Sequence, residues 1–327
     1  MVGPVDIALI CGAGCVTWLA GRLLIKVLAS RGVLDVPVAR SSHTTPTPRG
    51  GGIAVIGTIL VFGIFMGALP WELAVLLALL ASLGWIDDVY TIPPLPRFSA
   101  QIVAVYAALY LFPSISDVPG VGLPMILGTA IIGIGWLWFI NLYNFMDGID
   151  GITGAETLSI CLGVIIVVTI SGMAGDLVLP AGLIAMASLG FLVLNWHPAK
   201  IFLGDVGSIP LGFVIGWMLL TLAHQGALAS AIILPMYYLA DATITLLRRL
   251  CRREKIWQAH KEHFYQRAHQ GGLRHDQITL RISATNIGLI ILAVIATMGY
   301  AIPAMITAAV LTTLLLVHLG QQREAAG

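Results

Sequence analysis

The stretch TAIIGIGWLWFINLYNFMDGIDGITG, residues 129–154, joins an apolar segment directly to a cluster of amides and carboxylates. The first part is apolar enough to lie deep in a membrane. Asn141, Asn144, Asp147 and Asp150 then occur at every third position, with glycines among them. A carboxylate at the bilayer centre costs on the order of 3 kcal/mol on insertion scales. We therefore expect these acids at a water-filled surface, bound to a cation, or both.

The composition of the whole chain predicts an all-α membrane protein. Of its 327 residues 58% are hydrophobic and 10% are charged, whereas soluble domains carry about 25% charged residues. Roughly 20 apolar residues cross the hydrocarbon core, and about eleven segments qualify. They form one domain, residues 1–327. The expected spans are 5–26, 51–69, 71–87, 98–112, 122–141, 154–172, 177–195, 208–224, 227–247, 284–300 and 302–320.

The placement of charge predicts the orientation of these helices. With the N-terminus outside, the outer loops carry no Lys or Arg, only acids such as Glu72, Asp117 and Asp176. Positive residues collect on the cytoplasmic side, so we expect the N-terminus outside and the C-terminus inside. The net charge of +1 hides this asymmetry and gives no indication of nucleic-acid binding. The cytoplasmic loops then hold Arg31, Arg40, Arg49, Arg97, Lys200, a basic insert at about 248–283, and Arg323 in the tail.

Polar motifs fill all five of the expected cytoplasmic loops. A transporter would concentrate its polar residues near the bilayer midplane, at broken helices. The observed distribution instead predicts a membrane-embedded enzyme whose active site faces the cytoplasm. The motifs are ARSSHTTPTPRGGG (39–52), GWIDDVYTIPPLPR (84–97), NLYNFMDGIDG (141–151), NWHPAKIFLGDVGS (195–208) and RRLCRREKIWQAHKEHFYQRAHQGG (248–272).

Five aspartates in these loops are candidates for the chemistry. Asp87 and Asp88 form either a solvated pair or a site for a divalent cation or a general base, because Mg²⁺ bridges carboxylates to substrate phosphates. Asp147 and Asp150 precede Gly148 and Gly151, which weaken a helix and let the acids face one ligand. Asp205 lies between glycines just before the eighth span, as a helix cap or near a phosphate.

Two further motifs are candidates for binding anions. PRGGG places Arg49 beside Gly50 and Gly51, which fits a phosphate cradle, although a glycine-rich loop alone is weak evidence. His260 and His263 lie three residues apart among Lys and Arg, which favours an anion over a metal ion; a solvated basic loop is the alternative. Asp241, a lone acid within the ninth span, is a functional candidate with no assigned partner.

Together the five motifs resemble those of the polyprenyl-phosphate N-acetylhexosamine-1-phosphate transferase superfamily, glycosyltransferase family 4, of the O-antigen-initiating type. The resemblance rests on DVPVARSSHTTPTPRGGG (35–52), the DD pair at 87–88, NLYNFMDGIDG, NWHPAKIFLGDVGS and HKEHFYQR (260–267). It implies transfer of a UDP-linked N-acetylhexosamine 1-phosphate to undecaprenyl phosphate, giving undecaprenyl-PP-HexNAc and UMP. It also implies a magnesium cofactor, with manganese as a substitute.

The resemblance also assigns roles to single residues. Asp87 and Asp88 match a catalytic pair that organises phosphate and metal, with proton abstraction by Asp87 as a lesser role. The Lys that follows this pair in many members is replaced here by Tyr90 and Thr91, with Arg97 later. The remaining matches are catalytic or metal-binding Asp205, metal- or nucleotide-binding Asp147 and Asp150, nucleotide- or sugar-binding Asn141, Asn144, Phe202, His260 and His263, and phosphate-binding Arg49, Gly50 and Gly51.

The expected location is the bacterial inner membrane, as a multi-pass protein in the lipid bilayer with a homodimer as an option. The fifth loop has two separated histidines rather than a histidine run, which favours a small UDP-N-acetylhexosamine in O-antigen, lipopolysaccharide or related surface-glycan synthesis. Phospho-N-acetylmuramoyl-pentapeptide transferase is the alternative, and a lipid or nucleotide-sugar transporter ranks below both. The identity of the UDP-sugar and the pathway stay open.

Overall fold

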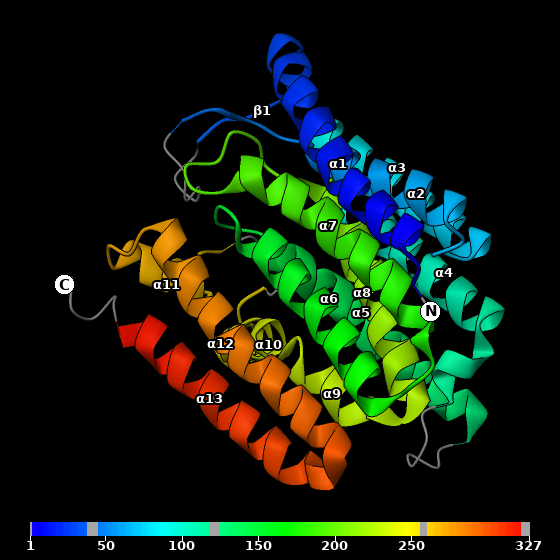
Figure 1. Cartoon of the computed structure of the whole chain (residues 1–327). Coiled ribbons are helices and arrows are strands. Elements are labelled where there is room, and N and C mark those ends of the chain that lie inside the picture. The colour runs from blue at the N-terminus through cyan, green and yellow to red at the C-terminus, as the bar shows by residue number, and fades with distance from the viewer. Residues whose placement is uncertain (1, 38–44, 118–123, 256–259, 322–327) are drawn as a thin grey trace.

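The computed structural model describes residues 2–37, 45–117, 124–255 and 260–321 (Figure 1). Part of the first polar motif (39–44, including Arg40), residues 256–259 of the basic insert and Arg323 lie outside these ranges.

Helices make up nearly all of the described chain. The sheet found there is a two-stranded antiparallel pair of β1 (Leu34–Asp35) and β2 (Thr47–Pro48). Short 3₁₀ turns lie at η1 (Pro113–Ser116) and η2 (Gly175–Leu177). The α-helices are α1 (Pro4–Ser30), α2 (Gly52–Phe65), α3 (Trp71–Tyr90), α4 (Pro94–Leu111), α5 (Met125–Phe145), α6 (Ile152–Ser171), α7 (Val178–Asn195), α8 (Asp205–Leu222), α9 (Leu228–Ile233), α10 (Met236–Cys251), α11 (Phe264–Gln270), α12 (His275–Ile295) and α13 (Ala301–Gln321).

Long apolar helices confirm a multi-pass membrane protein. Within the described ranges, 7 stretches are long and apolar enough to cross a membrane. One of them, His275–Gln321, contains both α12 and α13. The backbone changes direction between these two helices in the π-helical turn η4 (Ala296–Tyr300), where Gly299 has φ 93°. The two helices then lie side by side (Figure 1). The all-α class is confirmed, while the count of eleven spans stays a prediction.

The ninth expected span, 227–247, is wrong as a single helix. The structure divides it into α9, which ends at Ile233, and α10, which begins at Met236. Pro235 lies at the break, where its missing N–H and its ring prevent an uninterrupted helix. Just before α9, Gly226 has φ 97° in the π-helical turn η3 (Ala223–Ala227). Apolar composition alone does not reveal either interruption.

Helix α8 lies at the centre of the fold and carries the site at its first residue. Nearly all of its side chains are buried, as expected for a helix that is apolar on every face. It packs against α2, α3 and α5.

Glycines allow α2 and α3 to approach the beginning of α8 very closely. A Cβ added at Gly52 would lie 2.3 Å from the Cα of Gly207, and one added at Gly84 would lie 2.4 Å from the carbonyl oxygen of Asp205. No side chain fits in either position. The first polar loop and the DD pair are therefore held directly beside Asp205.

Candidate active site

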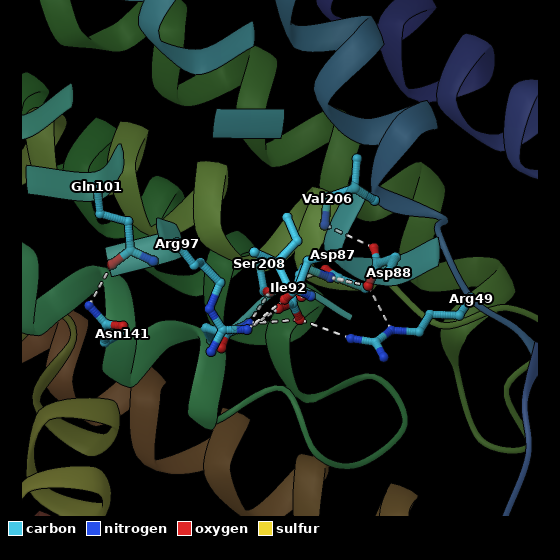
Figure 2. A network of polar contacts seen from close by, with 12 residues as sticks. Arg49, Asp87, Asp88, Ile92, Arg97, Gln101, Asn141, Val206 and Ser208 are labelled. Atoms are coloured by element: carbon cyan, nitrogen blue, oxygen red, sulfur yellow. Dashed lines mark hydrogen bonds and ion pairs between the residues drawn. The ribbon is translucent and has the colours of Figure 1, made fainter. Parts of the chain in front are cut away.

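The carboxylate of Asp205 is the meeting point of three side chains from three other segments. Its Oδ1 accepts hydrogen bonds from Nη2 of Arg49 at 2.9 Å and from Nδ2 of Asn144 at 3.1 Å. Its Oδ2 accepts from Nη1 of Arg97 at 2.9 Å. Figure 2 shows both arginines pointing into the same small region, Arg97 from α4 and Arg49 from the chain before α2. Two cations therefore converge on one nearly buried acid.

Asp88 holds the N-terminus of α8. Its two carboxylate oxygens accept the backbone N–H groups of Asp205 at 2.9 Å and Val206 at 3.0 Å, and Nε of Arg49 lies 2.7 Å from Oδ1 (Figure 2). The Asp88 side chain is fully buried. An acid at a helix N-terminus satisfies free N–H groups and complements the helix dipole. Asp88 thus positions Asp205.

Asp87 points to a different set of partners, although it is adjacent in sequence. Its Oδ1 accepts the N–H of Ile92 at 2.6 Å, and its Oδ2 accepts Nη1 of Arg97 at 2.6 Å. Helix α3 ends at Tyr90, and Thr91 takes a left-handed conformation with φ 54°. This turn brings Arg97 back onto Asp87 and Asp205. Arg97 therefore supplies the positive charge that the sequence lacked directly after the DD pair.

Asn144, near the end of α5, contacts Asp205, and Asp147, in the loop after α5, interacts with it electrostatically. Nδ2 of Asn144 also donates to Oγ of Ser208 at 2.8 Å. Burial raises the pKa of Asp147 to about 7, and the nearby carboxylates of Asp205 and Asp88 add to this shift. Asp147 is therefore an acid whose charge near neutral pH depends on what binds beside it.

Asp150 lies apart from Asp205 and faces two histidines. Its Oδ2 lies 2.6 Å from Nδ1 of His197 and 3.2 Å from Nδ1 of His275, and it accepts the N–H of Ala199 at 3.2 Å. Burial disfavours the carboxylate, but these contacts outweigh burial and lower the pKa of Asp150. A carboxylate oxygen of Asp150 and one ring nitrogen of each histidine lie within 4.8 Å of one another, a spacing that could hold a metal ion. Since Mg²⁺ prefers oxygen ligands, Asp147 fits a magnesium site beside Asp205 better than Asp150 does.

Asn141 lies outside the Asp205 cluster. Its Nδ2 donates to Oε1 of Gln101 at 2.7 Å (Figure 2) and to the carbonyl of Leu137 at 2.8 Å. It therefore joins α5 to α4, and its sugar-binding role stays a prediction.

The glycines of PRGGG do not present free N–H groups to an anion. The N–H groups of Gly50 and Gly51 both donate to the carbonyl of Phe202, at 3.2 and 2.8 Å. A phosphate cradle would need these donors, so in this structure Gly50 and Gly51 make a packing contact, and their phosphate-binding role stays a prediction. Arg49 remains a candidate for binding phosphate. Burial lowers the pKa of Arg49, but the charges of Asp88 and Asp205 outweigh burial and raise it. The same contact places Phe202 beside Arg49.

The fifth-loop histidines have different environments. His263 is buried, and its Nδ1 lies 3.1 Å from Oδ1 of Asp241. Asp241 also accepts the N–H groups of Phe264 at 3.0 Å and Tyr265 at 3.3 Å. Asp241, to which the sequence assigned no partner, therefore holds the histidine motif against α10. His260 is half-buried; burial, followed by its interactions with His263 and Arg249, lowers its pKa to about 4.

Helix α11 in turn joins this motif to the loop after α5. The hydroxyl of Tyr265 donates to the carbonyl of Phe145 at 3.1 Å, and a Cβ added at Gly148 would lie 2.1 Å from that hydroxyl oxygen. The third and fifth polar motifs are therefore in contact. Together with the Asp88, Arg49 and Asn144 contacts, all five loops form one connected assembly.

Sequence reasoning left three polar residues of this assembly without a site role. In the sequence Arg97 stands in place of a Lys after the DD pair, His197 is one residue of the motif NWHPAKIFLGDVGS, and His275 lies outside the five motifs. Each acquires its role through a partner distant in sequence: Arg97 through Asp205, and both histidines through Asp150. Loop charge pointed to Arg97, but no local pattern marks His275.

Comparison with known proteins identifies the family of this chain. The model of the family described as Glycosyl transferase family 4 matches residues 70–223. A probable undecaprenyl-phosphate N-acetylglucosaminyl 1-phosphate transferase of Bacillus subtilis (strain 168) is 30% identical over 281 residues, which is 82% of this chain and 77% of that protein. The chain belongs to glycosyltransferase family 4. The resemblance to this superfamily, inferred from the five motifs, is confirmed, while the O-antigen-initiating type stays a prediction.

The names of the relatives include two different sugar donors. A decaprenyl-phosphate N-acetylglucosaminephosphotransferase of Mycobacterium tuberculosis (strain ATCC 25618 / H37Rv) is 29% identical, over 79% of this chain and 74% of that protein. A phospho-N-acetylmuramoyl-pentapeptide-transferase of Streptococcus uberis (strain ATCC BAA-854 / 0140J) is 27% identical, over 65% of this chain and 69% of that protein. Family membership therefore leaves the sugar donor open.

Proposed function

We propose that the chain transfers an N-acetylhexosamine 1-phosphate from a UDP-sugar to undecaprenyl phosphate, releasing UMP. The oxygen of the lipid phosphate attacks the β-phosphorus of the donor, and the bond from that phosphorus to the oxygen bridging to the α-phosphate breaks. The products are undecaprenyl-PP-HexNAc and UMP.

The observation that carries this proposal is the convergence of Arg49, Arg97 and Asn144 on Asp205. Donor and acceptor are both multiply charged anions, so they repel one another in the absence of protein. Two guanidinium groups on one acid form a site that can exchange a protein carboxylate for phosphate oxygens, because Arg binds both groups in the same forked geometry. Positioning and neutralisation of charge supply most of the rate in phosphoryl transfer.

The acceptor needs little proton removal. A phosphate monoester has a second pKa near 6, so the lipid phosphate is mostly dianionic at neutral pH. Asp88 has both oxygens engaged by backbone N–H groups and Arg49, which makes it a positioning residue. Asp87 shares Arg97 with Asp205 and orients that guanidinium.

A magnesium ion fits the donor set at Asp205, with Mn²⁺ as a substitute. The carboxylates of Asp205 and Asp147 supply the hard oxygen ligands that Mg²⁺ prefers, and substrate phosphates complete such sites. The bound ion would neutralise charge on the pyrophosphate. Asn144 donates its amide N–H groups to Asp205 and Ser208, so its amide oxygen would be a further candidate ligand. Arg49 and Arg97 would then turn from Asp205 toward the phosphates.

We further propose that this site faces the cytoplasm of a bacterium, in the inner membrane. Arg31 and Lys200 are exposed, Arg281 is half-buried, and all three lie near the ends of helices on the side that carries Asp205. Asp117 and Asp176 lie in loops at the opposite ends. The positive-inside rule then supports an N-out, C-in chain with eleven crossings.

For the donor we propose a UDP-N-acetylhexosamine of the GlcNAc, FucNAc or QuiNAc kind, in the initiation of O-antigen or a related surface glycan. Two N-acetylglucosamine-phosphate transferases match more of this chain than the pentapeptide transferase does, which supports a small donor. His260, with its pKa of about 4, would contact the sugar as a neutral hydrogen-bonding group.

A donor panel tests this proposal. Purified protein, undecaprenyl phosphate and Mg²⁺ are incubated with each UDP-HexNAc and with UDP-muramyl-pentapeptide, and UMP release is measured. We expect release with at least one UDP-HexNAc. Faster release with UDP-muramyl-pentapeptide would favour the second candidate, a pentapeptide transferase. Release with no donor would overturn the proposed reaction.

A further inference from the structure

A groove with a basic lining lies between α1 and α7, outside the Asp205 assembly. Its volume is about 530 Å³. Trp18, Arg22 and Lys26 of α1 line one side, Val193 of α7 lines the other, and Lys200 in the loop after α7 closes one end. None of these residues contributes to the Asp205 assembly.

The three cations of this groove are not neutralised by the described part of the chain. No acid lines the groove, and no ion pair among the described residues includes Arg22, Lys26 or Lys200. Arg22 and Lys26 are four residues apart and so project from the same face of α1. Like charges at this spacing repel one another unless an anion lies between them.

The groove lies where a headgroup of the bilayer would be. Helix α1 has 27 residues, so it is about 40 Å long and exceeds the hydrocarbon thickness. Its C-terminal end extends past the neighbouring helices (Figure 1). The guanidinium of Arg22 lies over the ring of Trp18, 5.0 Å from its centroid, and Trp residues mark the membrane–water interface. The charged side chains of this groove are therefore expected at the depth of the phospholipid headgroups.

We propose that this groove binds the phosphodiester headgroup of an anionic phospholipid. Arg22, Lys26 and Lys200 contact the phosphate, while an acyl chain lies along Trp18 and Val193. Basic pockets between helices on the cytoplasmic side bind such headgroups, and the exposed Val193 continues the groove toward the lipid. The site is separate from the proposed transfer reaction and does not depend on it.

The test compares two triple variants of the full chain by native mass spectrometry. The protein is released from mixed micelles that contain phosphatidylglycerol, cardiolipin, phosphatidylcholine and undecaprenyl phosphate. One variant carries Arg22→Gln, Lys26→Gln and Lys200→Gln. The matched control carries Arg253→Gln, Lys255→Gln and Arg281→Gln, which remove the same charge from positions outside the groove.

We expect the wild type and the control to retain phosphatidylglycerol or cardiolipin, and the groove variant to lose about tenfold or more of it. Equal retention by all three proteins would overturn the proposal. So would equal retention of phosphatidylcholine, because the groove would then recognise only acyl chains. Loss of undecaprenyl phosphate alone from the groove variant would assign the groove to the acceptor instead.

A single-residue pair protects the test against misfolding of the triple variant. Arg22→Lys keeps the charge and should retain most of the anionic lipid, whereas Arg22→Gln should lose several-fold. Equal binding by the two would contradict a role for the charge of Arg22.

Discussion

The carboxylate of Asp88 holds the backbone of Asp205, accepting its N–H at 2.9 Å and that of Val206 at 3.0 Å. One acid of the DD pair thus fixes the position of the acid on which both arginines converge. Gly204, with φ 76°, makes the contact fit, because a Cβ there would lie 2.4 Å from an Asp88 oxygen. Geometry at the beginning of α8 is therefore set by α3.

Asp88→Asn should reduce both stability and activity. An amide presents only one acceptor, so one buried N–H loses its partner, at a cost of about 1–3 kcal/mol. We expect a lower thermal midpoint in detergent and a slower release of UMP. Asp176→Asn, at an exposed loop position, is the control. An unchanged midpoint for Asp88→Asn would show that Asp88 does not hold α8.

Arg97 is expected to act through its charge and its forked shape. Nη1 of Arg97 lies 2.6 Å from Asp87 and 2.9 Å from Asp205, so its loss leaves two acids close together. Arg97→Lys keeps the charge but loses the fork, and should slow UMP release about tenfold, with Arg97→Gln slower still. Equal rates for Lys and Gln would contradict a role for the charge.

The pH dependence of stability should report His260. In the unfolded chain its pKa is near 6.5, and in the folded protein it is about 4. As the pH falls through this window the unfolded state binds the proton first, so the free energy of unfolding decreases. Above pH 6.5 this contribution is fully present. We expect the thermal midpoint of wild type to fall more steeply between these pH values than that of His260→Asn.

A suitable control for this measurement is His318→Asn, at an exposed position of α13. It should retain the slope of the wild type. Identical slopes for wild type and His260→Asn would contradict the lowered pKa.

The proposed orientation predicts which positions react with a membrane-impermeant thiol reagent. The background needs Cys11, Cys15 and Cys251 removed, since all three are exposed, while Cys161 is buried. In intact cells Asp117→Cys should react and Gln270→Cys should react only after lysis. Gln270 is the suitable position in α11 because its side chain is exposed, whereas that of Tyr265 is buried and out of reach of the reagent. The reverse pattern would place the site on the outer face.

Much of the helical framework follows from apolar content. The expected span 71–87 corresponds to α3 from Trp71 to Tyr90, and 302–320 corresponds to α13 from Ala301 to Gln321. The span at 227–247 failed because a single Pro235 divides it while its surroundings stay apolar. Averaged hydrophobicity does not detect such a break.

The site was predictable as a set of loops but not as a set of contacts. Topology brought the five polar motifs to one side, and Asp205 proved central. Asp87 and Asp88 are adjacent in the sequence, yet successive residues of a helix point in directions about 100° apart, so the two acids have different partners. The pairing of Asp241 with His263 joins residues far apart in the chain, and local pattern carries no information on it.

The central claim is that Asp205 is the focus of the transfer reaction, and Asp205→Asn tests it most directly. The variant keeps the shape of the side chain and removes the charge that Arg49 and Arg97 contact. UMP release from UDP-GlcNAc and undecaprenyl phosphate is measured for wild type, Asp205→Asn and the exposed control Asp176→Asn, each purified and checked for its thermal midpoint. We predict that Asp205→Asn is slower than wild type by about 100-fold or more, while the control is unchanged. A folded Asp205→Asn protein with the wild-type rate would contradict the account.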